Sequence, residues 1–147
     1  MAKIKKTNAM RILDQHKIDY QMQPWADLPD DHPPMYKTLV TVGKSKENYV
    51  FVVPTNCELD LKKAAQAVGE KNIHMIKEKE LLPLTGYVHG GCSPLGMKKK
   101  LVTVIDDSIA NHPQILVSGG QVGLSVQVDP QDLVDVVEAK VQEIRTD

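Results

Sequence analysis

The segment Tyr36-Lys-Thr-Leu-Val-Thr-Val42, together with Tyr49-Val-Phe-Val-Val53 shortly after it, decides the fold class of this 147-residue chain. Both runs are rich in β-branched and aromatic side chains, which favour strands. The six residues between them, 43–48, include glycine, serine and asparagine, which are typical of turns. The pattern therefore predicts two strands joined as a hairpin.

The segments on either side of this hairpin have helical and strand patterns in irregular order. Apolar residues at helical spacing predict helices over residues 7–17, 58–68 and 77–82, and a last helix that begins at Asp129-Pro130. We expect Pro83 to end the third of these helices. Four residues should form the buried stripe of the second helix: Leu61, Ala64, Ala65 and Val68. Five apolar residues should form the inner face of the last helix: Leu133, Val134, Val137, Val141 and Ile144.

Five further strands are predicted, over residues 20–23, 73–76, 101–105, 114–118 and 124–128. Gly119, Gly120 and Gly123 are expected to shape a tight turn between the last two. Since the order lacks regular βαβ alternation, a doubly wound parallel sheet is excluded. The prediction is an α+β fold: a mixed, strongly curved sheet or partial barrel flanked by helices, in a single domain over residues 1–147.

The composition excludes several classes of protein. An apolar content of 41% and a net charge of −1 are ordinary for a folded domain, and the sequence has no apolar run of membrane-spanning length. The N-terminal lysines are not followed by the apolar region of a secretory signal. Cys57 and Cys92 lie far apart and form no CxxC pair, which favours reduced thiols in a cytoplasmic protein.

Basic and aromatic residues constrain any contact with nucleic acid. Arg11 and Arg145 are the only arginines, so paired contacts to phosphates or bases are scarce. The aromatic content is 4%, too low for a platform that stacks single-stranded bases. Lys98, Lys99 and Lys100 follow a glycine-rich segment, and we expect them to give at most a weak, salt-sensitive contact with a polyanion.

Candidate chemistry centres on the loop Gly90-Gly-Cys-Ser-Pro94. The five histidines are scattered and form no ligand pattern, so no metal or cofactor is expected, and His89 is interpreted as a surface residue. Cys92 or Ser93 would need a neighbouring base to act as a nucleophile, and no spacing supplies one. The glycines can instead bring backbone N–H groups close to a ligand, although by themselves they are better explained by a plain tight turn between strands.

Four segments in order carry a family resemblance: Tyr36-Lys-Thr-Leu-Val40, Glu58-Leu-Asp-Leu-Lys-Lys63, Thr85-Gly-Tyr-Val-His-Gly-Gly-Cys-Ser-Pro-Leu-Gly96 and Val117-Ser-Gly-Gly120. The chain resembles the YbaK/EbsC family, the free-standing relatives of the editing domain of bacterial prolyl-tRNA synthetase. The resemblance implies a barrel-like α+β domain that deacylates mischarged tRNA in trans, most simply cysteinyl-tRNA(Pro) and cysteinyl-tRNA(Cys). The implied partners are the aminoacyl-tRNA 3′ end and prolyl-tRNA synthetase.

The resemblance also assigns site residues. Lys37 matches the signature lysine, and the GxxxP loop matches Gly90 to Pro94, so Lys37, Gly90 and Gly91 are the implied catalytic residues. The implied substrate-binding residues are Thr38, Cys92, Ser93, Pro94, Ser118, Gly119 and Gly120. In this family the thiol of the substrate cysteine attacks its own ester carbonyl, which removes the need for an enzyme nucleophile. We expect Gly91 to have a positive φ and its Cβ space to be needed by the aminoacyl group.

Two departures from the family leave the amino-acid specificity open. Residues 26–35 replace a longer stretch whose helix walls the pocket, and Ser125 stands where many members have an aspartate that could hold the substrate amine. Two other functions remain as alternatives: a non-catalytic, regulatory or tRNA-binding protein of the EbsC type, and a hydrolase that uses Cys92 as a covalent nucleophile.

Overall fold

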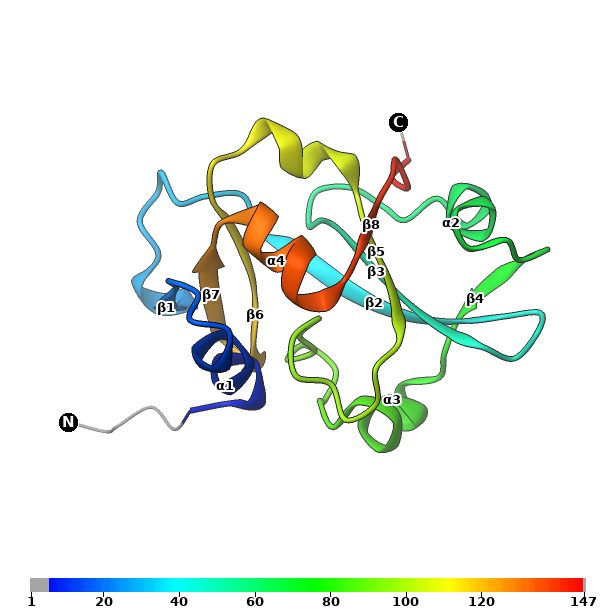
Figure 1. Ribbon diagram of the computed structural model, residues 1–147, viewed down its shortest axis with the longest axis horizontal. Helices are drawn as coiled ribbons and strands as arrows, with labels where there is room; N and C mark the ends of the chain where they lie inside the picture. Colours follow the sequence, from blue (N-terminus) through cyan, green and yellow to red (C-terminus); the bar gives the residue numbers. More distant parts are fainter. Residues whose placement is uncertain (1–5, 147) are drawn as a thin grey trace.

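The computed structural model describes residues 6–146 and contains two sheets (Figure 1). The smaller sheet is antiparallel, and its strand order is β1 (Gln21–Pro24), β7 (Leu124–Val128) and β6 (Ile115–Gln121). The larger sheet is mixed, and its strand order is β4 (Ile73–Met75), β2 (Tyr36–Gly43), β3 (Asn48–Pro54), β5 (Val102–Ile105) and β8 (Lys140–Val141). β2 and β3 form the predicted antiparallel hairpin, while β5 and β8 run parallel to their neighbours.

The α+β class is confirmed, but the predicted single, strongly curved sheet or partial barrel is wrong. Within residues 6–146 neither sheet closes, and the two sheets meet at one bridge between Met35 and Leu116. There the Leu116 N–H donates to the carbonyl of Pro34 at 2.9 Å. Pro33 and Pro34 have no N–H to donate, so the pairing cannot extend toward the N-terminus from this bridge.

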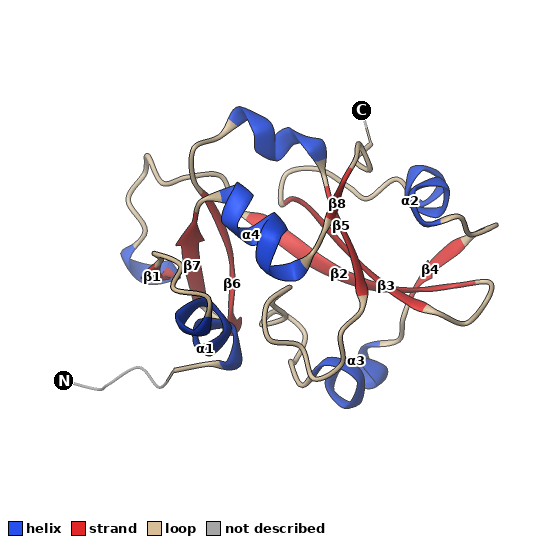
Figure 2. Ribbon diagram, viewed as in Figure 1, coloured by secondary structure: helices blue, strands red, loops and turns tan. Residues whose placement is uncertain are grey.

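In the described part of the chain, four helices pack on the sheets (Figure 2): α1 (Asn8–Gln15), α2 (Leu61–Val68), α3 (Glu78–Thr85) and α4 (Pro130–Val137). Local sequence explains the ends of α2, because the Asp60 carboxylate accepts from the N–H groups of Lys62 and Lys63 and Gly69 has a φ of 73°. Two short 3₁₀ helices complete the fold, at Trp25–Asp27 and Asp107–Asn111. No helix of the described part of the chain is both long and apolar enough to cross a membrane.

Three predictions of local structure are wrong. Pro83 lies inside α3 and does not end it; it is near the C-terminal end, where a missing N–H costs the helix one hydrogen bond. α4 ends at Val137, and Val141 belongs to β8, because pairing with β5 outweighs the continued apolar spacing. β6 runs through Gly119 and Gly120 with a register shift, so the reversal of the chain falls at residues 122–123.

The larger sheet is buried on both faces, which explains the unbroken apolar run of β3. Val50 and Val52 contact the main core, formed with α1, α4 and the smaller sheet. Phe51 and Val53 contact a second core, formed with α2. The second core includes Ile144, which the sequence analysis placed on the last helix, and it excludes Leu61, a residue that is 43% exposed.

Candidate active site

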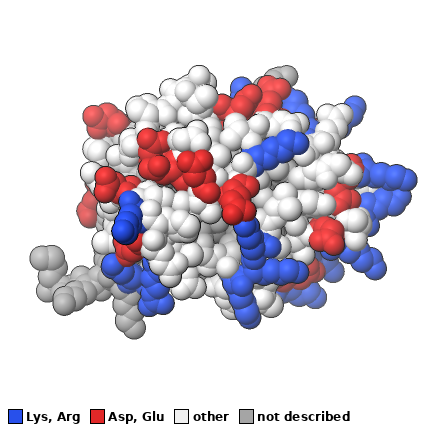
Figure 3. Space-filling model, in the orientation of Figure 1, with Lys and Arg blue, Asp and Glu red and all other residues white. Residues whose placement is uncertain are grey.

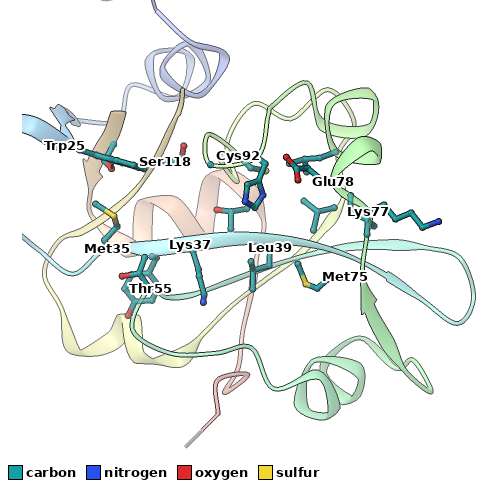
Figure 4. Close-up of a pocket in the computed structure, with 18 residues that line it drawn as sticks. Trp25, Met35, Lys37, Leu39, Thr55, Met75, Lys77, Glu78, Cys92 and Ser118 are labelled. Carbon is teal, nitrogen blue, oxygen red and sulfur yellow. Dashed lines mark hydrogen bonds between the residues drawn. The ribbon is translucent and has the colours of Figure 1, made fainter. Parts of the chain in front are cut away.

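A pocket of about 430 Å³ lies along one edge of β2 (Figure 4). Five of the ten residues implied by the family resemblance line it: Lys37, Thr38, Gly90, Cys92 and Ser118. The other five lie outside the lining: Gly91, Ser93, Pro94, Gly119 and Gly120. The structure thus brings together three segments that are far apart in the sequence, and it separates the residues of each glycine-rich loop into lining and supporting ones.

The pocket exists because the first half of β2 has a partner on only one side. On the other side β4 pairs with residues 41–43, and β6 meets the strand at Met35. The register fixes the direction of the groups between these contacts. Met35 accepts from Thr55 on the β3 side, whereas Val40 accepts from the Ile76 N–H on the opposite side. Because alternate residues of a strand point their backbone groups the same way, the N–H and C=O of Thr38 face the pocket.

Thr38 adds a side-chain group to this open edge. Its hydroxyl oxygen is buried, and it has no hydrogen-bond partner among the described residues. A buried polar group without a partner costs about 1–3 kcal/mol. Thr38 is one of the residues that line the pocket, so a polar ligand group that reached this hydroxyl would remove the cost.

Lys37 is next to Thr38 but projects from the opposite face of β2, on the same side as Thr55 and Leu39 (Figure 4). Its ammonium lies 3.9 Å from the carboxylate of Glu58, whose side chain is 84% exposed. A pair at this distance with so exposed a partner is worth little. The Lys37 ammonium therefore keeps donors for an anionic or carbonyl oxygen at the edge of the pocket.

The loop that carries Gly90 forms the wall across from Lys37. Gly90 has a φ of 87° and lines the pocket. Gly91 does not have a positive φ, so that expectation is wrong. Gly91 is required for another reason: a Cβ there would lie 2.9 Å from the Val122 nitrogen. Its N–H donates to the carbonyl of Val88 at 3.0 Å, so it is already used within the loop.

The rest of this loop is buried. The Ser93 hydroxyl accepts from the Leu95 N–H at 3.2 Å, and Pro94 is covered, so both support the loop from beneath. Cys92 lines the pocket, but burial raises the pKa of its thiol to about 12, and the Thr85 hydroxyl beside it offsets this only in part. The thiol is protonated at neutral pH, which disfavours its use as a nucleophile.

Of the segment Ser118-Gly119-Gly120, Ser118 alone lines the pocket. The Ser118 hydroxyl accepts from the Gly120 N–H at 3.2 Å. The Gly119 carbonyl accepts from the Thr7 hydroxyl at 2.5 Å, and Gly120, with a φ of 92°, packs on Tyr87. These two glycines tie α1 to β6 behind the lining.

Several lining residues were missed by the sequence analysis, among them Trp25, Met35, Met75, Glu78 and His89. The Trp25 indole N–H donates to the Ser125 hydroxyl at 2.9 Å, across 100 positions of sequence. His89, interpreted from sequence as a surface residue, is exposed and also lines the pocket. No local pattern marks the other four, although Trp25 is the sole tryptophan of the chain.

The described residues do not meet the requirements of a metal site. Among residues 6–146, no three or more His, Cys, Asp or Glu side chains form a group that could hold a metal ion. What the pocket offers is a lysine ammonium, hydroxyl groups and backbone polar groups, set in apolar surroundings such as Met35, Leu39 and Met75. Such an arrangement can bind and orient a polar ligand that carries an apolar or thiol side chain.

Comparisons with known proteins agree with this architecture. Residues 29–136 match the family described as "Aminoacyl-tRNA editing domain". The chain is 39% identical, over 96% of its length and 94% of the relative, to an Enterococcus faecalis protein named "Putative Cys-tRNA(Pro)/Cys-tRNA(Cys) deacylase EbsC". A crystal structure described as "a putative trans-editing enzyme for prolyl tRNA synthetase" superposes with a TM-score of 0.79 at 22% identity, covering 95% of this chain and 96% of the other. The protein therefore belongs to the YbaK/EbsC family of aminoacyl-tRNA editing domains.

Proposed function

We propose that this protein is a trans-acting editing enzyme that deacylates mischarged tRNA, with cysteinyl-tRNA(Pro) and cysteinyl-tRNA(Cys) as its substrates. The observation that carries the proposal is the open edge of β2. There Lys37, Thr38 and Gly90 line one pocket, and the Thr38 hydroxyl has no hydrogen-bond partner among the described residues. The 39% identity to the Enterococcus faecalis relative supports the choice of substrate.

In this mechanism the substrate supplies the nucleophile. The thiol sulfur of the esterified cysteine attacks its own carbonyl carbon, and the bond from that carbon to the terminal ribose oxygen breaks. The thiol proton is transferred to the ribose oxygen, and the cysteine leaves as a cyclic thioester that water opens. The protein binds and orients the ester, which is where most of the rate acceleration of such a reaction arises. The protonated Cys92 thiol is consistent with this division of roles.

Each site residue then has a physical task. Lys37 donates to the ester oxygens at the edge of the pocket, and Thr38 donates or accepts through the hydroxyl that has no other partner. Gly90 lets the main chain approach the aminoacyl group, while Gly91 holds that segment against the turn after β6. Ser118 closes the side near Trp25. No step in this scheme requires a metal or a cofactor.

Exposed lysines on the surface support a contact with the tRNA backbone. Figure 3 shows Asp and Glu side chains gathered over α4 and Lys and Arg side chains toward the end that holds the β2–β3 turn. Lys98, Lys99 and Lys100 are exposed, although Lys100 forms an ion pair with Glu138. In this proposal Lys98, Lys99 and Lys100 bind the tRNA backbone through a salt-sensitive contact in the cytoplasm. Prolyl-tRNA synthetase is a proposed partner that would deliver the substrate.

The decisive experiment measures release of amino acid from preformed cysteinyl-tRNA(Pro), with alanyl- and seryl-tRNA(Pro) as comparisons. We expect rapid release from the cysteinyl ester and much slower release from the seryl ester, because a hydroxyl is a weaker nucleophile than a thiol. Binding of tRNA without release above the spontaneous rate would overturn the proposal and favour the non-catalytic alternative.

Lys37→Ala sharpens this experiment. Loss of a hydrogen bond to a charged group costs about 1.5–3 kcal/mol, which corresponds to a reduction in kcat/KM of about ten- to a hundredfold. Lys44→Ala is the matched control, because Lys44 is an exposed lysine just beyond the other end of β2 and does not line the pocket. A folded Lys37→Ala variant with full activity contradicts the role assigned to Lys37.

A further inference from the structure

We infer that the Glu78 carboxylate receives the α-ammonium group of the bound aminoacyl ester, and so makes this residue a determinant of specificity for a free amine. The inference rests on the proposed function. An aminoacyl ester carries an ammonium near neutral pH, and a charge held among apolar side chains needs a charged or hydrogen-bonding partner. The question is which lining residue can be that partner.

Ser125 cannot supply a charge. Its side chain is buried, with 1% of the residue exposed, and its hydroxyl accepts from the Trp25 indole at 2.9 Å. That hydrogen bond holds Trp25 at the pocket and uses one of the two lone pairs of the hydroxyl oxygen. Ser125 therefore offers an ammonium at most a neutral acceptor, besides its effect on the position of Trp25.

Glu78 is the one carboxylate among the 18 described residues that line the pocket. It forms no ion pair within 4.0 Å to any residue of the described chain, so its charge is not neutralised by the protein. A carboxylate is the strongest acceptor for an ammonium, since both partners of the hydrogen bond are charged. Glu78 is thus chemically suited to bind the ammonium group of the substrate.

The position of Glu78 fits the same assignment. In Figure 4 its carboxylate points toward Cys92, on the loop side of β2, while the Lys77 side chain extends away from the pocket. Lys37 projects from the other face of β2. One anion and one cation therefore flank the open strand edge. An aminoacyl ester has its ammonium one carbon from its carbonyl, so it can place the carbonyl toward Lys37 and the ammonium toward Glu78.

Glu78 also has a structural role that the test must separate from ligand binding. Glu78 and Glu80 both lie in the first turn of α3, where negative charge stabilises the helix, and the N-cap residue Lys77 provides no side-chain hydrogen bond. Glu80 does not line the pocket. Glu80→Gln is therefore a matched control, because it removes a charge from the same turn without touching the site.

The experiment compares wild type, Glu78→Gln and Glu80→Gln on cysteinyl-tRNA(Pro) and on N-acetylcysteinyl-tRNA(Pro), whose nitrogen carries no charge. We expect Glu78→Gln to lower kcat/KM for the free-amine substrate about tenfold and to change it less than about twofold for the acetylated substrate. Glu80→Gln should leave both values unchanged.

Two results would overturn the inference while leaving the proposed function intact. One is full activity of Glu78→Gln on the free-amine substrate. The other is an equal loss on both substrates, which would show that Glu78 acts only by stabilising α3. Failure of the wild-type protein to release cysteine from either substrate would instead refute the proposed function itself.

Discussion

Two glycine pairs in this protein, Gly90-Gly91 and Gly119-Gly120, look alike in sequence but differ in what surrounds them. Each pair has one residue with a positive φ, Gly90 at 87° and Gly120 at 92°. The other residue of each pair is confined: a Cβ at Gly91 would lie 2.9 Å from the Val122 nitrogen, where there is no room, and a Cβ at Gly119 would lie 3.2 Å from the Leu124 side chain, which would have to move slightly. Only Gly90 lines the pocket.

Only Gly90 lines the pocket because the segment around Gly120 lies behind the Gly90 loop and contacts it from there. Gly91 packs on the turn after β6, and Gly120 packs on Tyr87, which precedes the Gly90 loop. The Tyr87 hydroxyl donates to the carbonyl of Leu95, at the far end of that loop. Gly119 and Gly120 therefore support the loop that carries Gly90 and Gly91. We expect a substitution in the first pair to lower the rate of deacylation and a substitution in the second pair to lower the free energy of unfolding.

The largest effect is expected for Gly91→Val. The new side chain would overlap the backbone at residues 121 and 122, which cannot move without distorting the β6–β7 turn. We expect the loop to shift by about 1 Å and kcat/KM on cysteinyl-tRNA to fall about a hundredfold. Deacylation kinetics and circular dichroism check this together. Gly123→Ala is the control for backbone strain without a clash, since a side chain is strained at its φ of 83° but no atom lies within 4 Å of its Cβ position. Equal activity of the two variants would contradict the support role of Gly91.

A smaller effect, on stability and not on rate, is expected for Gly120→Ala. The methyl group combines strain at positive φ with a contact of 2.9 Å to the Tyr87 ring. Overpacking of this kind costs about 1–3 kcal/mol in the free energy of unfolding. Urea denaturation measures this loss, and kcat/KM of the folded variant should stay within about threefold of wild type. If Gly120→Ala lost activity while its stability stayed unchanged, the claim that the second glycine pair acts on stability and not on rate would be wrong.

The smallest effect is expected for Cys92→Ala. Although Cys92 lies in the loop that lines the pocket, burial raises the pKa of its thiol to about 12, so the group is not an effective nucleophile at neutral pH. Activity on cysteinyl-tRNA should stay within about twofold of wild type, and native Cys92 should react with an alkylating reagent more slowly than the less buried Cys57. Mass spectrometry locates the modified thiol. A folded but inactive Cys92→Ala variant, with an acyl-thioester trapped on wild-type Cys92, would establish covalent catalysis instead.

Local signals allowed much of the fold to be predicted. The β2–β3 hairpin follows from two strand-like runs with a turn between them, and the ends of α2 follow from Asp60 and Gly69, whose effects reach only three or four residues. Predictions failed where a distant partner outweighed such signals. Val141 continues the apolar spacing of α4, yet it pairs with Ile105 in the larger sheet.

The features of the candidate site likewise fall into those that the sequence predicts and those that only the structure shows. The sequence by itself determined the α+β class, the hairpin, the helix caps and, through the family resemblance, the segments that meet at the pocket, because these depend on residue types and short spacings. Only the tertiary structure decided that the first half of β2 has an open edge, that Thr38 lacks a partner, that Trp25 bonds to Ser125 and that Glu78 lines the pocket. Those facts depend on which strand ends where and on contacts between residues up to 100 positions apart. Such contacts arise from packing of the whole chain, which no local pattern encodes.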